Sequence, residues 1–98
     1  MMYYFDIDGV ICSDEKGEYE KAKPFKKRIQ KVNNLYDDGH TIVFYTGRGK
    51  KTKINWRKLT EEQFKKWGVK YHKILFTKEP FEILVDDKAI NDKVFFNG

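Results

Sequence analysis

Two aspartates, Asp6 and Asp8, lie at the end of an apolar and aromatic stretch formed by residues 2–7. Such a stretch is typical of a buried β-strand, in which residues two apart project to the same side. Gly9 follows directly and allows the backbone to approach a ligand closely. Two carboxylates placed in this way can serve acid–base or nucleophilic chemistry. The pattern alone leaves open whether they do so or are solvated acids at a strand end.

A second acidic pair, Asp86 and Asp87, follows the short apolar run 83–85. If both runs are strands of one parallel sheet, four carboxylates meet at one edge of that sheet. Like charges this close repel each other, and they remain ionised together only when a cation lies among them. Oxygen ligands of this kind suit Mg²⁺, which takes one or two carboxylates and keeps positions for water and a phosphate. The two pairs together therefore predict a Mg²⁺ site formed by Asp6, Asp8, Asp86 and Asp87.

Groups that suit the oxygens of a phosphate follow another apolar run, residues 40–45. Thr46 supplies a hydroxyl, Gly47 an accessible backbone N–H and Arg48 a cationic side chain. Lys78, beyond a third apolar run, would place a positive charge over the acids and over a transferring phosphoryl group. Taken singly, Thr46 is equally consistent with a residue that caps a loop, and Lys78 with an ordinary surface lysine. The order of the groups along the chain makes a phosphate site the stronger interpretation.

Strands and helices alternate along the sequence. One helix is expected from Pro24 to a stop at Gly39, and a second from the capping-box spacing Thr60–Gln63 to Gly68. Alternation of this kind implies right-handed crossovers and a mainly parallel sheet that helices cover on both faces. Ligands of such sheets bind at the carboxyl ends of the strands. The expected strands are residues 2–7, 40–45, 73–76 and 83–85, with 94–96 as a last edge strand.

The chain has 98 residues, which predicts a single domain over residues 1–98. No run of apolar residues is long enough to span a membrane, and an acid comes too early for a signal peptide. The single cysteine, Cys12, excludes an internal disulfide, and no Cys/His cluster offers a zinc site, so we expect a cytoplasmic protein. Position 18 is Glu18, so the Cys-x₅-Arg pattern of cysteine phosphatases is missing, and Cys12 is expected to be buried.

The formal net charge of +5 is concentrated in one stretch. The segment 39–60 carries six basic residues and no acid, and its positive charge begins just after Thr46. We name it the basic segment and expect it to line the mouth of the phosphate site, with Lys50 and Lys51 contacting the substrate. Such a rim attracts a small anionic substrate, but Lys and Arg also bind nucleic acid, and the sequence leaves both open. The six are Arg48, Lys50, Lys51, Lys53, Arg57 and Lys58.

The order of these motifs resembles that of the haloacid-dehalogenase-like phosphatase superfamily, and the resemblance covers essentially the whole chain. Residues 4–10 (Tyr-Phe-Asp-Ile-Asp-Gly-Val) are similar to its first motif and 44–48 (Phe-Tyr-Thr-Gly-Arg) to its second. Lys78 and residues 85–92 follow, as in the small phosphatases of surface and capsular polysaccharide biosynthesis. Those relatives commonly have Pro where this chain has Glu79, and often Thr-Ala-Arg in the second motif.

The resemblance implies a Rossmann-like three-layer α/β/α domain and a division of roles. Asp6 would be the nucleophile that forms an aspartyl-phosphate, and Asp8 would protonate the leaving oxygen and later activate water. Thr46 and Lys78 would position and neutralise the phosphoryl group. Mg²⁺ would be held by Asp6, the backbone carbonyl of Asp8 and Asp86, with Asp87 in the outer shell.

The superfamily normally gains selectivity from an inserted cap domain, and this chain has no insertion long enough for one. The site is therefore expected to be open, accepting large substrates or a lid from another subunit. A small sugar phosphate is the first expectation for the substrate. A nucleic-acid end is the alternative, since the phosphatase domain of polynucleotide kinases has the same motif order. A receiver-like phosphoacceptor or a non-catalytic phosphate-binding module is a further alternative, although in receivers the adjacent acids come first and here Asp86 and Asp87 come last.

Overall fold

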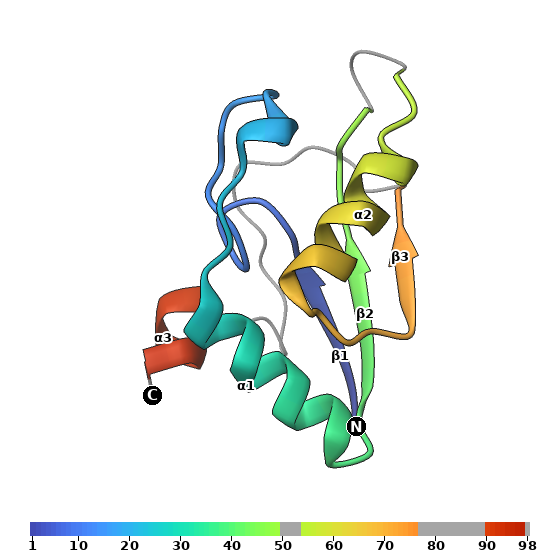
Figure 1. The fold of residues 1–98 in the computed structure, drawn as a ribbon. Helices are drawn as coiled ribbons and strands as arrows, with labels where there is room; N and C mark the ends of the chain where they lie inside the picture. The colour runs from blue at the N-terminus through green and yellow to red at the C-terminus, as the bar shows by residue number, and fades with distance from the viewer. Residues whose placement is uncertain (50–53, 77–89, 98) are drawn as a thin grey trace.

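The computed structural model describes residues 1–49, 54–76 and 90–97 (Figure 1). The predicted strand 83–85 and the motif residues Lys50, Lys51, Lys78, Asp86 and Asp87 lie outside these ranges. None of the helices within them is long and apolar enough to cross a membrane. The elements are β1 (Met2–Asp6), a 3₁₀ turn (Tyr19–Lys21), α1 (Lys26–Asp37), β2 (Thr41–Tyr45), α2 (Arg57–Trp67), β3 (Lys73–Leu75) and α3 (Asp92–Asn97).

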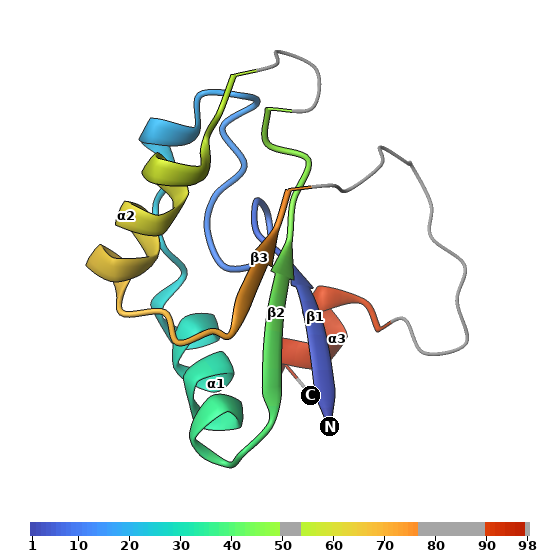
Figure 2. The ribbon, with the colours of Figure 1, turned by 90° about the vertical axis from the view of Figure 1, so that its right-hand side faces the viewer.

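The three described strands form a parallel sheet in the order β1-β2-β3. Asp6 pairs in register with Tyr45, and Tyr45 with Leu75, so the three strands end at the same edge. Right-handed crossovers between sequential strands place both connecting helices on one face. Figure 2 shows α1 and α2 on that face, with α3 beside β1. The predicted α/β class, with a parallel Rossmann-like sheet and no cap domain, is confirmed; a helix layer on the other face stays a prediction.

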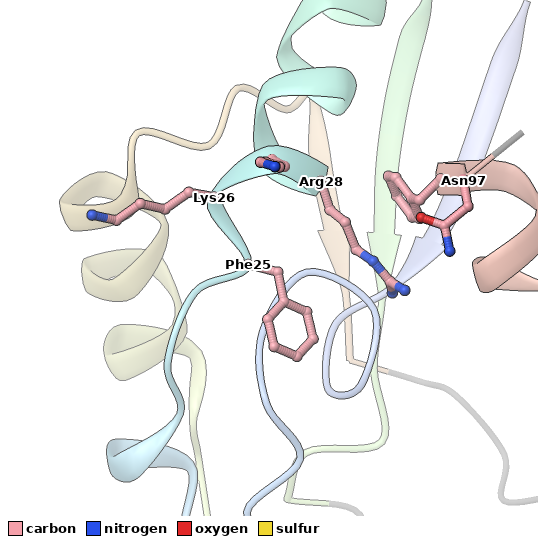
Figure 3. Close-up of a pocket in the computed structure, with 6 residues that line it drawn as sticks. Phe25, Lys26, Arg28 and Asn97 are labelled. Atoms are coloured by element: carbon pink, nitrogen blue, oxygen red, sulfur yellow. The ribbon is translucent and has the colours of Figure 1, made fainter.

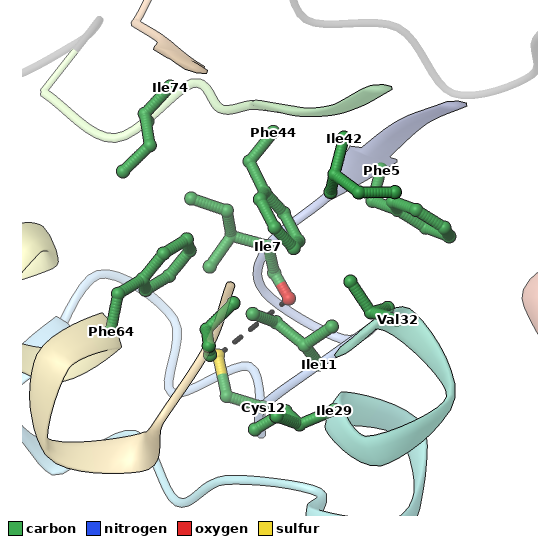
Figure 4. Close-up of a cluster of buried hydrophobic side chains, with 11 residues drawn as sticks. Phe5, Ile7, Ile11, Cys12, Ile29, Val32, Ile42, Phe44, Phe64 and Ile74 are labelled. Carbon is green, nitrogen blue, oxygen red and sulfur yellow. Dashed lines mark hydrogen bonds between the residues drawn. The ribbon is translucent and has the colours of Figure 1, made fainter. Parts of the chain in front are cut away.

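The core lies between this sheet face and the two crossover helices (Figure 4). Alternation along β2 directs Ile42 and Phe44 into it, and both side chains are fully buried. The ring of Phe44 meets that of Phe64 from α2 edge to face, with centroids 4.9 Å apart. Burial of each such side chain contributes roughly 1.5–3 kcal/mol. These contacts hold α2 against the carboxyl half of the sheet, beside the predicted site.

Helix α1 lies within the predicted range, with an apolar stripe on its inner face. It begins at Lys26, two residues after Pro24, and Ile29 and Val32 are buried against the sheet. The chain leaves the helix at Gly39, whose φ of +93° lies in the left-handed region that glycine adopts without strain. The predicted boundaries of this helix are correct to within two residues.

The predicted start of the second helix is wrong by three residues. Helix α2 begins at Arg57, where the side-chain oxygen of Asn55 accepts the Arg57 N–H at 2.9 Å. Asn55 therefore satisfies one of the N–H groups that have no partner inside the helix. Thr60 and Gln63 lie inside the helix, and their side chains point to a buried arginine, so their capping-box spacing is coincidental.

The expected edge strand at 94–96 is also wrong, because these residues belong to helix α3. Phe95 and Phe96 both lie against the ring of Phe5, with centroids 5.7 Å and 6.1 Å away. Consecutive residues of a strand point to opposite faces and could not share this neighbour. The helix begins beside Asn91, whose side-chain oxygen accepts the Lys93 N–H at 2.9 Å.

Gly49 lies where two parts of the chain approach closely, directly after Arg48. Its φ is +84°, and a Cβ atom there would lie 2.2 Å from the carbonyl oxygen of Ile54. A backbone oxygen cannot yield as a flexible side chain does. Gly17, by contrast, has a φ of +97° with nothing within 4 Å of a Cβ atom. An alanine at Gly17 would therefore meet only an unfavourable backbone conformation, whereas an alanine at Gly49 would meet that conformation and a steric clash as well.

We expect Gly49→Ala to destabilise the protein more than Gly17→Ala. The left-handed conformation alone costs an alanine about 1–2 kcal/mol, which is the whole effect expected at Gly17. At Gly49 the clash with the Ile54 carbonyl adds to that loss. Urea unfolding of both variants measures the difference, and equal losses at the two positions would contradict the close approach at Gly49.

Candidate functional site

Asp6, Asp8 and Thr46 lie at the carboxyl edge of the sheet. Asp6 is the last residue of β1, and Thr46 follows β2 with its N–H donating to the Leu75 carbonyl at 2.9 Å. The chain turns tightly after β1, with the Gly9 N–H donating to the Cys12 carbonyl at 2.8 Å. This turn keeps Asp8 beside the sheet edge. Parallel strands carry their ligand sites at this edge, so the placement agrees with the sequence expectation for these three residues.

The carboxylate of Asp6 is half-buried and locally fixed. One of its oxygens, Oδ1, accepts the N–H of Ile7 at 2.7 Å. This contact within adjacent residues holds the plane of the carboxylate at the strand end. Asp6 is therefore oriented before any ligand arrives, which lowers the reorganisation that binding requires.

Arg48 is the main departure from the sequence interpretation. Its guanidinium has no exposure and binds Asp8 through two hydrogen bonds, Nε to Oδ2 at 3.0 Å and Nη2 to Oδ1 at 2.8 Å. The other nitrogen, Nη1, donates to Thr60 Oγ1 at 3.0 Å and to Gln63 Oε1 at 2.8 Å. Nη2 also lies 3.8 Å from Cys12 Sγ.

All five N–H donors of Arg48 therefore face acceptors within the protein. The expectation that Arg48 contacts a phosphate at the rim is corrected on this ground, since the side chain is buried and has no donor left over. The signal missed in the sequence is the pair Thr60 and Gln63, which are polar yet lie on the inner face of α2.

Tyr19 closes the same cluster from the loop before α1. Its ring centroid lies 4.7 Å from Arg48 Cζ, and its backbone carbonyl accepts Gln63 Nε2 at 2.7 Å. Trp56 meets the ring edge to face at 5.0 Å. Burial, with the negative charge of Asp8 as a smaller cause, raises the pKa of Tyr19 above its ordinary value. The loop is thereby fixed to α2 beside Asp8.

Thr46 and the glycines contribute differently to the edge. Thr46 is buried, and its Oγ1 accepts the Arg48 N–H at 3.1 Å, which is the loop-capping role. Its hydroxyl hydrogen is not used in that bond and is the group that could face a phosphate oxygen. Gly47 is half-buried and Gly9 exposed, so the backbone at both can be approached closely.

The carboxyl edge can be tested for its fit to Mg²⁺ from its donor atoms. Asp6 offers a carboxylate, the hard oxygen ligand that Mg²⁺ prefers. The carboxylate of Asp8 is engaged by Arg48, so Asp8 fits the site through its backbone carbonyl, as the resemblance implies. Across residues 1–49, 54–76 and 90–97, no three Asp, Glu, His or Cys side chains are grouped to hold a metal ion. The described donors fit part of a Mg²⁺ site.

A cavity of about 380 Å³ lies elsewhere, between the start of α1 and the end of α3 (Figure 3). Phe25, Arg28 and Phe96 line it, and Lys26, at its border, points away from Arg28 in Figure 3. Arg28 donates to Asp92 at 2.9 Å, so its charge is paired within the protein. None of the predicted site residues that the structure describes lines this cavity, so it is separate from the described part of the carboxyl edge.

The described fold is that of a capless Rossmann-like α/β domain, and a solved structure shares it. The crystal structure of an MCSG target from Vibrio cholerae matches this chain with a TM-score of 0.86 and 22% sequence identity. The match covers 99% of this chain and 88% of that one. No family model and no curated protein matches the chain. At this identity the likeness establishes the fold alone.

Cys12 is buried beneath the Arg48–Asp8 pair, as the sequence predicts. Its Sγ lies 3.7 Å from both the Ile7 carbonyl oxygen and Asp8 Oδ1, which are the two acceptors within reach of its single S–H proton. Burial, and then the charge of Asp8, raises the pKa of the thiol to about 12. The thiol is therefore protonated throughout the neutral range and cannot act as a nucleophile there.

We expect iodoacetamide to modify Cys12 at least ~100-fold more slowly in the native protein than in the urea-unfolded chain at pH 8. The raised pKa has a second consequence for stability. Above the ordinary thiol pKa the unfolded chain loses a proton that the folded chain keeps, so stability falls as pH rises from about 9 toward 12. Mass spectrometry of timed samples measures the modification, and equally fast native modification would contradict the burial of the thiol.

Proposed function

We propose that the protein is a Mg²⁺-dependent phosphomonoester hydrolase that acts through an aspartyl-phosphate on Asp6. The observation that carries the proposal is the pair of fixed carboxylates, Asp6 and Asp8, at the carboxyl edge of a parallel sheet. Ligands of parallel sheets bind at this edge. The motif order Asp-x-Asp-Gly, Thr-Gly-Arg, Lys78 and Asp86-Asp87 supports the same chemistry from the sequence.

In the first step, a carboxylate oxygen of Asp6 attacks phosphorus and the bond from phosphorus to the ester oxygen breaks. Asp8 would give the departing oxygen its proton, the acid role that the resemblance implies. In the second step, Asp8 takes a proton from water as the water oxygen attacks phosphorus. Inorganic phosphate leaves, Asp6 is restored as a carboxylate and Asp8 is again protonated.

The remaining motif residues stabilise charge in this scheme. The Thr46 hydroxyl and the Gly47 N–H would donate to phosphoryl oxygens, and Lys78 would neutralise their charge. Bound Mg²⁺ supplies further charge neutralisation at the phosphoryl group. In the described chain, Asp6 and the Asp8 carbonyl are the groups that would hold it.

The substrate proposed is a small anionic phosphomonoester such as a sugar phosphate. We expect the basic segment to supply positive charge near the sheet edge, where it would raise the local concentration of an anion. Arg57 and Lys58, its described members apart from Arg48, are exposed. With Arg48 buried, this exposed charge is smaller than the sequence indicated, which favours a small substrate over a polynucleotide.

A panel of phosphate esters tests this function directly. We expect hydrolysis of sugar phosphates in the presence of Mg²⁺, a loss of at least ~100-fold on chelation and recovery when Mg²⁺ is added back, because the metal neutralises the phosphoryl charge. Malachite-green detection of phosphate measures the rates.

The same panel separates the alternatives. Preference for a 3′-phosphorylated oligonucleotide would identify a nucleic-acid end phosphatase. A stable phosphoprotein after acetyl-phosphate treatment, without turnover, would favour a receiver-like phosphoacceptor. Rates that do not change on exhaustive chelation would remove the metal from the proposal.

The nucleophile is tested by Asp6→Asn. The amide is of nearly equal size but cannot attack phosphorus, so kcat is expected to fall by more than ~10³-fold with the fold retained. Asp37→Asn is the matched control, since Asp37 is exposed and pairs with Lys70 at 2.7 Å on the surface. Near wild-type turnover of the Asp6 variant would show that another residue is the nucleophile.

A further inference from the structure

The guanidinium of Arg57 lies over the ring of Phe76 at the carboxyl end of the sheet. Its Cζ is 4.7 Å from the ring centroid. Arg57 is the first residue of α2, and Phe76 follows Leu75, the last residue of β3. Figure 1 shows the start of α2 at this end of the sheet. The ring restricts the orientations of a side chain that is otherwise flexible, so the cation is held in place before any ligand arrives.

The N–H groups of this guanidinium remain available to a ligand. The side chain of Arg57 is 52% exposed, and a phenyl ring has no oxygen or nitrogen to accept its N–H groups. Within the described residues its ion-pair partner is Glu61, whose Oε2 lies 4.0 Å from Nη1, which is longer than a hydrogen bond. Arg57 therefore differs from the buried Arg48, whose donors all face acceptors inside the protein.

Arg57 lies on the same sheet edge as Asp6, at a distance that one small molecule can span. Asp6 pairs in register with Tyr45, and Tyr45 with Leu75, so the ends of β1 and β3 are two strand spacings apart. Two such spacings are about 10 Å. The Thr46 N–H donates to the Leu75 carbonyl at 2.9 Å, which joins the proposed phosphate site to the end of β3. A molecule whose phosphate lies at Asp6 can therefore reach Arg57.

We propose that Arg57 binds a second anionic group of the substrate, a carboxylate or a further phosphate about 10 Å from the phosphorus that Asp6 attacks. This inference rests on the proposed function. A guanidinium meets either group with two parallel N–H···O bonds, a match that the hydroxyl groups of a sugar do not offer. The substrate class narrows accordingly to phosphomonoesters that carry a second anion at the far end of a chain long enough to span this distance.

The experiment compares two matched pairs of esters, in each of which only the first member carries a second anion. The pairs are 6-phosphogluconate with sorbitol 6-phosphate, and fructose 1,6-bisphosphate with fructose 6-phosphate. The wild-type protein should prefer the first member of at least one pair in kcat/KM. Arg57→Gln should lower that preference by about 10-fold, mainly through KM, because it removes a charge-assisted pair. The first pair tests a carboxylate, and the second pair tests a further phosphate.

Three variants separate the geometry of Arg57 from its charge. Lys58→Gln removes the same charge from the next residue, which is also exposed, and should change the preference less than ~2-fold, since consecutive helix residues point about 100° apart. Arg57→Lys keeps the charge without the fork and should recover only part of the preference. Phe76→Leu keeps the charge but removes the ring, and should lower the preference by about 3-fold. Equal losses in Lys58→Gln and Arg57→Gln would show a general attraction for anions and overturn the proposal.

The remaining outcomes distinguish this inference from the proposed function. Hydrolysis without a preference, or with a preference that Arg57→Gln leaves unchanged, rejects the second-anion site while the phosphatase function stands. A wild-type protein that hydrolyses none of the four esters rejects the proposed function. Calorimetric titration with the same esters then decides the Arg57 site by itself, because the site requires that Arg57→Gln weaken the binding of an ester with a second anion, and unchanged binding rejects it.

Discussion

The buried guanidinium of Arg48 places the strongest demand on this structure, because a charge without water needs an acceptor for every N–H. Those acceptors come from separate parts of the chain: Asp8 and Cys12 after β1, and Thr60 and Gln63 on α2. The demand can be met only where the end of β2, the turn after β1 and the inner face of α2 converge. The geometry of the sheet edge and the position of α2 are thereby tied to one side chain.

The hydrophobic core makes that convergence possible. Phe44 from β2 and Phe64 from α2 meet edge to face on the side of the sheet where the helices lie. One turn of helix before Phe64 lies Thr60, so the burial that fixes α2 also aims Thr60 at Arg48. Interiors are close-packed and shift little, so a polar cluster built on such a helix has a defined geometry. The stability of the core and the orientation of Asp8 are consequently linked.

The features of the fold that can be predicted from the sequence are those that depend on residues close together in the chain. The strand at residues 2–7, the range of α1 and its stop at Gly39 follow from local pattern, and all are confirmed within two residues. The run 94–96 is ambiguous, since short aromatic runs suit either a strand or a buried helix face, and only packing on Phe5 decides. Arg48 lies beyond local prediction altogether. Whether its guanidinium binds a substrate or Asp8 depends on where the fold places Asp8, which lies 40 positions away in the chain.

Because Arg48 is buried, the basic segment contains both a buried, paired cation and cations that are exposed to solvent. The charge of Arg48 is matched by Asp8 in the interior, where dissolved salt screens it much less than at the surface. Exposed members such as Arg57 and Lys58 act through water, and their attraction for an anion weakens over a Debye length of about 10 Å at 0.1 M salt. Capture of a charged substrate and orientation of Asp8 therefore respond differently to ionic strength, although both arise from one run of cations. The formal net charge of +5 therefore bears on the capture of a charged substrate and not on the orientation of Asp8, because the Arg48–Asp8 pair carries no net charge.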